Sequence, residues 1–427
     1  LDAYIEDLAL RYRVPAEVIF DANTLTFQVQ TVGQKLDTET LRQQITTALF
    51  SPFPIGRTIT MNFLPDPKPD VSVLREAILT YFNRYGIFYD SLDSVVSVYV
   101  EDLATGESTG IQSHVLHSAT STAKIGVIAN YFRYVYQLPS QEIIYRMLAA
   151  IICSSNADAN ILMNITGNGD DLAGLRMTTD TFCRAGAGNT RVDHHFFIGP
   201  AGEGAVPVNY YDPAGAPMCS VSSPLEPAPS FPIDEGIQTT AADMGHFLSE
   251  IYACATQGEG LATYFPSEIT QEECGYMLEI LRGTNFSHMI ELGVPPTVEV
   301  AHKVGYAAQA AADAGIVFSP NGDYVITIYM WDERLGNFDN YALSRWTVMG
   351  EVSRIVYNFF NPDAQLLMPQ TPLNPNGGAA CVLPSSPEEA SLININAGRF
   401  DENGEPLPTA CYDWPNCRPF DNWGRSE

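Results

Sequence analysis

The chain has 427 residues, 45% of them apolar, which is enough for one large domain with smaller additions around a substantial core. Its formal net charge of -28 argues against a basic surface for nucleic-acid phosphates or for an anionic membrane. No apolar run approaches the length of a membrane span. The chain begins at Leu1 without a methionine, and we expect that an export signal or anchor preceded it.

The cysteines do not predict a metal site, because none shows the Cys-x-x-Cys spacing typical of zinc. The eight are Cys153, Cys183, Cys219, Cys254, Cys274, Cys381, Cys411 and Cys417. An even number in an acidic, lysine-poor chain favours disulfides in an oxidising, extracytoplasmic location, with buried free thiols as the alternative. The spacing does not give the pairing, although Cys411 and Cys417 are close enough for a local loop.

Residues 1–70 are predicted to form a small α+β unit. Apolar residues alternate as in a strand at 27–31 and again at 59–63, and a helix is predicted from Thr38 to Leu49. Three prolines between 65 and 69 predict a stiff linker.

The segment FDANTLTFQVQTVGQKLDTETLRQQITTAL within this unit resembles a peptidoglycan-binding module that precedes some L,D-transpeptidase domains. The resemblance covers most of the first 65 residues and implies attachment to the cell wall. The alternative is a plain packing module.

The main domain is predicted to span residues 71–361. Strands are predicted at Val95–Glu101 and in a hairpin near 315–331, and a helix with a clear apolar stripe closes the domain near Phe359. Helices at both ends, with strands near both ends, predict a sheet built from the two termini and a helical region in the middle. The stretch 197–238 has no clear period and is predicted to be functional or mobile.

Residues 362–427 form a third region, which is proline-rich, acidic and contains three of the cysteines. We expect an extended, disulfide-held tail on the surface, or partial disorder.

Two of the chain's four lysines stand in motifs that suit acyl transfer, and the first of these is Ser121-Thr122-Ala123-Lys124. A serine hydroxyl needs a base to become a nucleophile, and residues three apart at a helix start share a face. Lys124 can take the proton if burial and a second cation lower its pKa. Alone, the motif is equally typical of a helix-capping serine and a surface lysine.

The second and third motifs follow in the chain. In Ser154-Ser155-Asn156, Ser154 is a candidate to relay a proton to the leaving group, and Asn156 to bind a substrate carbonyl and hold Lys124; turn residues are the alternative. In the segment Lys303-Val304-Gly305-Tyr306, Lys303 is predicted to attract a substrate carboxylate from an inner strand, with an ordinary strand and one long lysine as the alternative.

Substrate binding is also assigned to the neighbours of Lys303. Gly305 lets a ligand approach the backbone, with Val304 beside it, and the amide of Tyr306 together with that of Ser121 is predicted to form an oxyanion hole.

The order Ser-x-x-Lys, Ser-x-Asn, Lys-x-Gly resembles that of the class A β-lactamase and penicillin-binding-protein superfamily. The segments SVYVEDLATGE, HSATSTAKIGV, CSSNADANILM, QTTAADMGHFLSEIY and VAHKVGYAAQAAADAGIVF carry the likeness over most of 71–361. The resemblance implies a three-layer αβα (α+β) domain with an antiparallel sheet and a helical subdomain. It also implies a serine hydrolase, β-lactamase-like or D,D-peptidase-like, that passes through an acyl-enzyme on Ser121.

Three residues depart from the family pattern. Ser155 stands where Asp is usual, and Val304 stands where Thr or Ser is usual, which removes a hydroxyl. The resemblance places an Ω-loop near NTRVDHHFF, with Arg191 and Asp193 as its ion-pair framework, and Phe196 falls where the deacylating Glu is expected. Without a base for water the acyl-enzyme should persist, unless His194 or His195 takes that role.

The sequence therefore predicts an exported serine acyl-transfer enzyme that acts on a carboxylate-bearing amide or ester, either a β-lactam or a peptidoglycan peptide, and is a poor β-lactamase. A non-catalytic wall-binding or scaffold protein of the same fold is the alternative. We expect no metal, no cofactor and no nucleic-acid partner. A metal enzyme is the least favoured hypothesis, because the histidines lack ligand spacing; His194 and His195 are expected to be structural or exposed.

Overall fold

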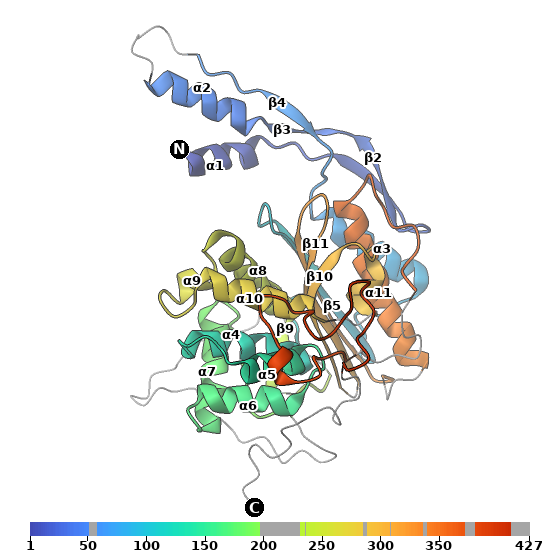
Figure 1. Cartoon of the computed structure of the whole chain (residues 1–427). Coiled ribbons are helices and arrows are strands. Elements are labelled where there is room, and N and C mark those ends of the chain that lie inside the picture. Colours follow the sequence, from blue (N-terminus) through green and yellow to red (C-terminus); the bar gives the residue numbers. More distant parts are fainter. Residues whose placement is uncertain are drawn as a thin grey trace, which may run out of the picture.

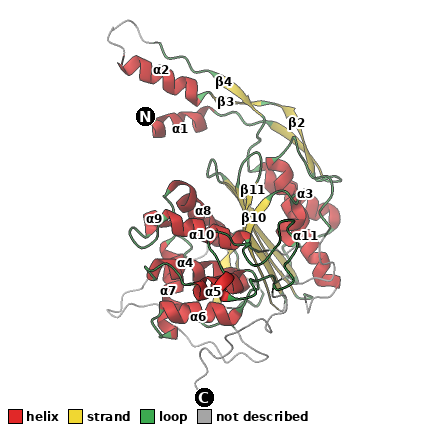
Figure 2. Cartoon of the chain, in the orientation of Figure 1, coloured by secondary structure: helices red, strands yellow, loops and turns green. Residues whose placement is uncertain are grey.

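The computed structural model describes residues 1–50, 58–196, 231–234, 236–284, 288–307, 309–335, 340–371 and 381–410. Most of the irregular stretch 197–238 and the pair Cys411 and Cys417 lie outside these ranges. The described residues form an α+β structure, as predicted (Figure 1, Figure 2).

A five-stranded antiparallel sheet lies at the centre, in the order β10-β11-β12-β5-β6. Its strands are β5 (Ser94–Asp102), β6 (Ser108–Ile111), β10 (Glu299–Ala307), β11 (Ala310–Phe318) and β12 (Tyr324–Asp332). The sheet thus joins the two ends of the predicted main domain. Every residue of β12 is buried, because helices cover both faces of the sheet, and the strand is therefore mostly apolar rather than alternating.

One face of the sheet is covered by α3 (Val73–Tyr85) and α11 (Asn340–Phe360). Val98, Val100 and Ile328 point into the apolar core on this side. The short 3₁₀ helix η2 (Met289–Gly293) packs against α11 at the edge of the same core.

The other face carries the helical region, as Figure 1 shows. Its elements are η1 (Thr120–Ala123), α4 (Lys124–Tyr134), α5 (Gln141–Ile151), α6 (Asn156–Thr166), α7 (Asp171–Arg184), α8 (Ala241–Gln257), α9 (Leu261–Tyr264) and α10 (Gln271–Arg282). A small sheet of β7 (Leu116–Ser118), β9 (Ile237–Thr240) and β8 (Arg191–Val192) lies beside it. A second apolar core fills this side and includes Ala301, Ala312 and Ala314 from the sheet.

The N-terminal residues form α1 (Asp2–Tyr12), β1 (Glu17–Asp21), β2 (Thr26–Thr31), β3 (Gly33–Leu36), α2 (Thr38–Phe50) and β4 (Phe63–Asp66). The hairpin of β1 and β2 packs on α11, where the Phe27 and Phe359 rings are 5.6 Å apart and the Asn358 amide donates to the Leu25 carbonyl. The helices and the β3–β4 pair extend away from the central sheet (Figure 1) and enclose a small core of their own.

Two predictions for this unit were wrong. Residues 59–61 lie outside any strand, and Ile59 and Met61 are exposed, because only the last part of the alternating stretch pairs with β3. Pro65 is not in a linker but in β4, opposite Gln34; proline is tolerated in such an edge strand because no donor is needed on its outer side.

The described C-terminal residues 381–410 lie against the helical region, with η3 (Pro387–Glu389) in contact with α5. Leu383, Leu392 and Ile395 join the apolar core of that region. Disulfides join Cys153 to Cys381 and Cys254 to Cys274, and no free cysteine occurs among the described residues. The disulfide hypothesis is therefore confirmed for these four cysteines.

Candidate active site

Ser121 lies in the 3₁₀ turn η1, directly ahead of α4, at the edge of strand β10. Thr120, before it, has a positive φ of 51°, which a β-branched residue rarely adopts and which costs on the order of 1 kcal/mol or more. This turn leaves the Ser121 side chain partly exposed, so solvent and a ligand can reach its hydroxyl.

Lys124 is the first residue of α4 and is fully buried. Its Nζ lies 3.0 Å from Ser121 Oγ, 2.6 Å from the Ser154 carbonyl oxygen and 2.6 Å from Asn156 Oδ1. The last two atoms are acceptors only, so they take two N–H groups of the amine. In the protonated amine a third N–H donates to Ser121 Oγ; a neutral amine, with two N–H groups and one lone pair, would present the lone pair to that oxygen instead.

The electrostatic surroundings favour the same neutral state. Burial, followed by the nearby charge of Lys303, holds the pKa of Lys124 well below its usual value, and Asp158 opposes the shift only in part. A lysine with a lowered pKa can accept the Ser121 proton, which is the condition that the first motif required.

The loop between α5 and α6 brings Ser154 to both lysines. Ser154 Oγ lies 3.3 Å from Lys124 Nζ and 3.0 Å from Lys303 Nζ, although Lys303 is 149 residues away. Ser154 has a positive φ of 55°, which aims its carbonyl at Lys124. Ser155 caps α6 by accepting from the Asp158 amide, a role that serine fills as well as aspartate, so the departure at this position keeps the local structure.

Strand β10 contributes Lys303 and Gly305 to the site. Lys303 is fully buried on the face toward the helical region, and it donates to Ser154 Oγ and to the Val304 carbonyl, 2.8 Å away. Burial lowers the pKa of Lys303 to about 7, against the opposing effect of Asp313. Gly305 allows η1 to lie close, because a Cβ at this position would be 2.9 Å from the Ser121 nitrogen.

The side chains of two predicted binding residues, Val304 and Tyr306, do not lie with the two lysines. The Val304 side chain is 3% exposed and packs in the core on the α11 face, so the structure does not bring it to the two lysines. Tyr306 is 39% exposed, and its ring centroid lies 6.1 Å from that of Trp346 at the edge of the sheet.

A comparison with protein-family models gives one match, to the β-lactamase enzyme family, over residues 137–360. This range is just over half of the 427-residue chain. The chain belongs to the β-lactamase enzyme family. The matched range contains Ser154 and Lys303 but begins after Ser121 and Lys124. The hydrogen bonds described above connect all four residues in one site.

Solved structures of the same superfamily align with most of this chain's length. They include PBP-A (18% identity, TM-score 0.47, covering 69% of this chain and 98% of that chain) and a β-lactamase from Desulfarculus baarsii DSM 2075 (16%, 0.47, 68% and 98%). An ancestral class A β-lactamase aligns at 19% identity and a TM-score of 0.45, covering 66% of this chain and 98% of that chain. No curated protein sequence matches significantly.

Phe196 lies beside Lys124. Its ring centroid lies 4.9 Å from Lys124 Nζ, and its side chain is 5% exposed. Asn160 fixes the backbone on both sides, donating to the Phe196 carbonyl at 2.8 Å and accepting from the Phe196 amide at 2.9 Å. The loop therefore presents an aromatic ring to the lysine at the position where the family resemblance led us to expect a carboxylate.

The predicted ion pair between Arg191 and Asp193 was wrong. No hydrogen bond reaches Asp193 Oδ1 or Arg191 Nε, and burial raises the pKa of Asp193 to about 6, with Arg191 close enough only to oppose the shift. The loop is instead held by His194, whose Nε2 lies 2.9 Å from Asp234 Oδ1, and this hydrogen bond raises the pKa of His194. This hydrogen bond fits the structural role expected for His194, which stays a prediction.

Sequence reasoning missed a buried charged triad behind Lys303. His302 lies between Asp313, 2.8 Å from its Nδ1, and Glu291, 3.0 Å from its Nε2. Burial alone would lower the pKa of His302, but the two carboxylates raise it to about 10. The signal in the sequence was Asp313 within the apolar run AAADAGIVF, since a buried carboxylate requires a partner.

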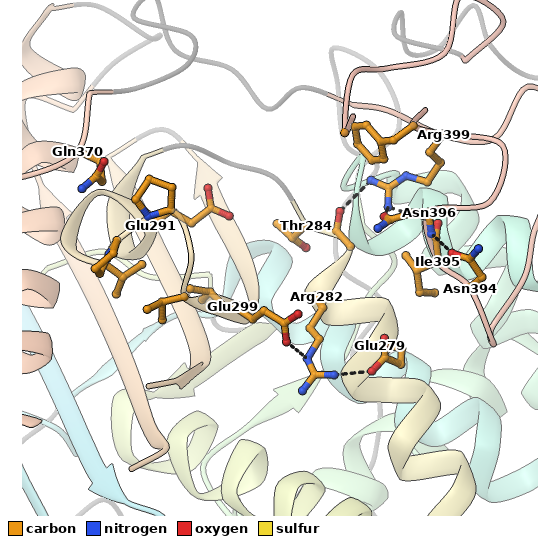
Figure 3. A pocket seen from close by; sticks show the side chains of 18 of the residues that line it. Glu279, Arg282, Thr284, Glu291, Glu299, Gln370, Asn394, Ile395, Asn396 and Arg399 are labelled. Carbon is orange, nitrogen blue, oxygen red and sulfur yellow. Dashed lines mark hydrogen bonds and ion pairs between the residues drawn. The ribbon is translucent and has the colours of Figure 1, made fainter. Parts of the chain in front are cut away.

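A separate cavity of about 640 Å³ lies between the end of α10, η2 and the C-terminal segment, and Glu291, Arg282 and Arg399 are among its lining residues (Figure 3). None of the motif residues lines it. Across the described ranges, no cluster of three or more His, Cys, Asp or Glu side chains is arranged to hold a metal ion. No helix in those ranges has the length and apolar character to cross a bilayer.

Proposed function

We propose that this protein is an exported serine acyl-transfer enzyme that attacks a carboxylate-bearing amide or ester and forms a covalent acyl-enzyme on Ser121. The observation that carries the proposal is the buried Lys124 amine, 3.0 Å from Ser121 Oγ, with a second buried lysine linked to it through Ser154. A base within hydrogen-bond reach of a hydroxyl, with its own orientation fixed by other groups, is what nucleophilic catalysis requires.

Acylation begins when the lone pair of Lys124 Nζ takes the hydroxyl proton and Ser121 Oγ attacks the substrate carbonyl carbon. The negative charge moves to the carbonyl oxygen, which the amides of Ser121 and Tyr306 are placed to bind in this proposal. One such donor contributes about 2.7–4 kcal/mol to the transition state.

The leaving nitrogen must then receive a proton as the acyl bond to it breaks. Ser154 Oγ is the relay: it donates its own proton to the nitrogen and recovers one from Lys124, 3.3 Å away. Lys303, 3.0 Å from the same oxygen, supports this transfer and attracts the substrate carboxylate. Asn156 holds Lys124 from the other side, 2.6 Å away.

We propose that deacylation has no comparable base. A water molecule must lose a proton to attack the ester, and Phe196 offers only its ring beside Lys124. Because a positioned general base contributes about 10²- to 10⁴-fold, we propose slow hydrolysis and a long-lived adduct. The substrate is a β-lactam or a peptidoglycan peptide, both of which combine an amide with a carboxylate.

An extracytoplasmic location fits the disulfides, since cytosolic conditions keep thiols reduced. The N-terminal unit extends from the catalytic region (Figure 1), and we propose that it contacts the cell wall.

The decisive experiment is intact-protein mass spectrometry after exposure to a fluorescent penicillin and, separately, to a fluorophosphonate. A single adduct that maps to Ser121 and disappears in Ser121→Ala supports the proposal. Absence of an adduct with both probes would refute it.

That second result would favour a wall-binding scaffold that keeps the fold without turnover. The observation in favour of the scaffold is Phe196, whose ring lies beside Lys124 at the sequence position where the family resemblance led us to expect the deacylating carboxylate. The tightly hydrogen-bonded Lys124 counts against it, because burying a lysine without using it is costly.

A further inference from the structure

The loop that carries Ser154 is joined covalently to the C-terminal segment. Cys153, the residue immediately before Ser154, forms a disulfide with Cys381, 228 residues later in the chain. The bond therefore links the proposed proton relay to a segment that follows the closing helix α11 and lies outside the family match at 137–360.

Ser154 needs such a restraint. Its positive φ of 55° is unfavourable for a residue with a side chain, by about 1–2 kcal/mol, and persists only when the surroundings impose it. On its C-terminal side, the Ser155 amide donates to the Ala149 carbonyl at 3.0 Å, and Ser155 caps α6. On its N-terminal side, the disulfide is the covalent restraint.

The C-terminal segment is itself firmly held, so it can act as an anchor. Arg399 is 1% exposed and donates to the Val382 carbonyl at 2.7 Å and to the Gly283 carbonyl, at the end of α10, at 2.9 Å (Figure 3). Gln141, at the start of α5, donates to the Glu388 carbonyl at 2.6 Å.

Packing continues from this anchor to the loop. A Cβ on Gly283 would lie 2.9 Å from both Ile152 Cδ1 and Ile395 Cγ2, so the residue before Cys153 and the C-terminal segment both press on the end of α10. The disulfide and this contact fix the two residues that precede Ser154 against one rigid surface.

We propose that Cys153 and Cys381 are positioning residues: their disulfide uses the C-terminal segment to hold Ser154 in the left-handed conformation that aligns its hydroxyl between Lys124 and Lys303. This inference rests on the proposed function. Losing the disulfide is expected to impair the proton delivery to the leaving group more than the attack by Ser121. Ser154 Oγ is itself the relay, whereas Lys124 loses only the Ser154 carbonyl as a partner and keeps its contacts with Ser121 and with Asn156 of α6.

The test compares two probes that differ in what their leaving group needs. A penicillin expels a nitrogen that must be protonated, whereas a fluorophosphonate expels fluoride, which leaves without a proton. In the variant Cys153→Ala/Cys381→Ala, penicillin acylation is expected to slow by about 10- to 100-fold, the scale expected when a reacting group shifts by about 1 Å. Fluorophosphonate labelling of Ser121 should change by less than threefold.

The matched control is Cys254→Ala/Cys274→Ala, which removes a fully buried disulfide between the end of α8 and the start of α10. It should lower the melting temperature and leave the ratio of the two probe rates unchanged. Equal slowing of both probes in the Cys153 variant, or no slowing of either, would overturn the positioning role. If the wild-type protein reacts with neither probe, the proposed function fails instead.

A second route applies if the double variant does not fold. Dithiothreitol reduces a disulfide to two thiols and is itself oxidised to a cyclic disulfide, and iodoacetamide then caps the thiols. Peptide mass spectrometry identifies protein alkylated at Cys153 and Cys381 alone, and its two probe rates must show the same separation. An unchanged ratio in that species contradicts the proposal.

Discussion

Lys124 Nζ has two kinds of neighbour. The hydroxyl of Ser121, the carbonyl of Ser154 and the amide oxygen of Asn156 all lie within 3.0 Å of it. The ring of Phe196, held in place by Asn160, lies with its centroid 4.9 Å away. We propose that the polar neighbours serve to form an acyl-enzyme, whereas the aromatic one offers no base to hydrolyse it.

This difference teaches that the two halves of a hydrolytic cycle can be separated within one site. A protein with the first half alone is a covalent acceptor of its substrate, and a transferase or a slow hydrolase. The predictions below test acylation and deacylation separately, and then the stability of the strand that carries Lys303.

Replacing the base should have the largest effect. Lys124→Met keeps the length of the side chain but removes the lone pair, so acylation by a fluorescent penicillin should slow by about 10²- to 10⁴-fold. Stopped-flow labelling measures this rate. Lys35→Met, at an exposed lysine of β3, is the control and should retain the wild-type rate. Acylation of Lys124→Met at the wild-type rate would remove Lys124 from the mechanism.

A carboxylate in place of the Phe196 ring should speed the hydrolysis of the acyl-enzyme. Phe196→Glu places an acid beside Lys124, and the lifetime of the penicillin adduct should shorten by about tenfold or more as water gains a base. The new charge also favours the protonated form of Lys124, so acylation should slow in the same variant.

Phe196→Gln has a similar shape without the base and serves as the control. Its adduct should persist as in the wild type, and a glutamine variant that hydrolyses as fast as the glutamate variant would contradict the account. Time-resolved intact-mass spectra give both lifetimes.

The protonation of Lys303 should limit acylation at high pH. Its pKa is lowered to about 7, so the charge that attracts the substrate carboxylate is present below pH 7 and is lost above it. The second-order acylation rate constant, which reports the free enzyme, should fall by up to about tenfold per pH unit above that value. Lys303→Arg keeps the charge at all these pH values and should abolish the alkaline decline; a decline that survives this change would have another cause.

The smallest expected effect is on the free energy of unfolding, through His302, which neighbours Lys303 on β10. The pKa of His302 is raised to about 10 from an ordinary value of about 6.5, so between these values the folded protein holds a proton that the unfolded chain has released. Its contribution is complete below about pH 6.5 and is lost as the pH rises through 10. The difference in unfolding free energy between wild type and His302→Asn should therefore shrink over this range. Urea titrations at pH 6 and pH 10 measure it, and a constant difference would contradict the assignment.

The sequence predicted the parts of the site that local spacing controls. Ser121 and Lys124 meet because they are three residues apart on one turn. The sequence named Ser154 and Lys303 as separate candidates, and their contact across 149 residues emerged from the fold. The pairing of Cys153 with Cys381 could not be predicted, because spacing does not reveal which distant residues a fold brings together. The triad at His302 was missed for the same reason.

Other errors came from local patterns that tertiary contacts overrode. Arg191 and Asp193 are close in sequence, yet it is His194 and Asp234 that form the ion pair of this loop. Pro65 suggested a linker, but its neighbours pair with β3 and make it part of an edge strand.

The most direct test of the central claim is the stoichiometry of a single reaction. Wild-type protein is mixed with excess penicillin, and both the opened product and the mass of the protein are followed over time. The account predicts one equivalent of adduct on Ser121, formed in a rapid phase and persisting while free product accumulates slowly. Rapid release of many equivalents of free product without an accumulating adduct would contradict it, as would the absence of any adduct.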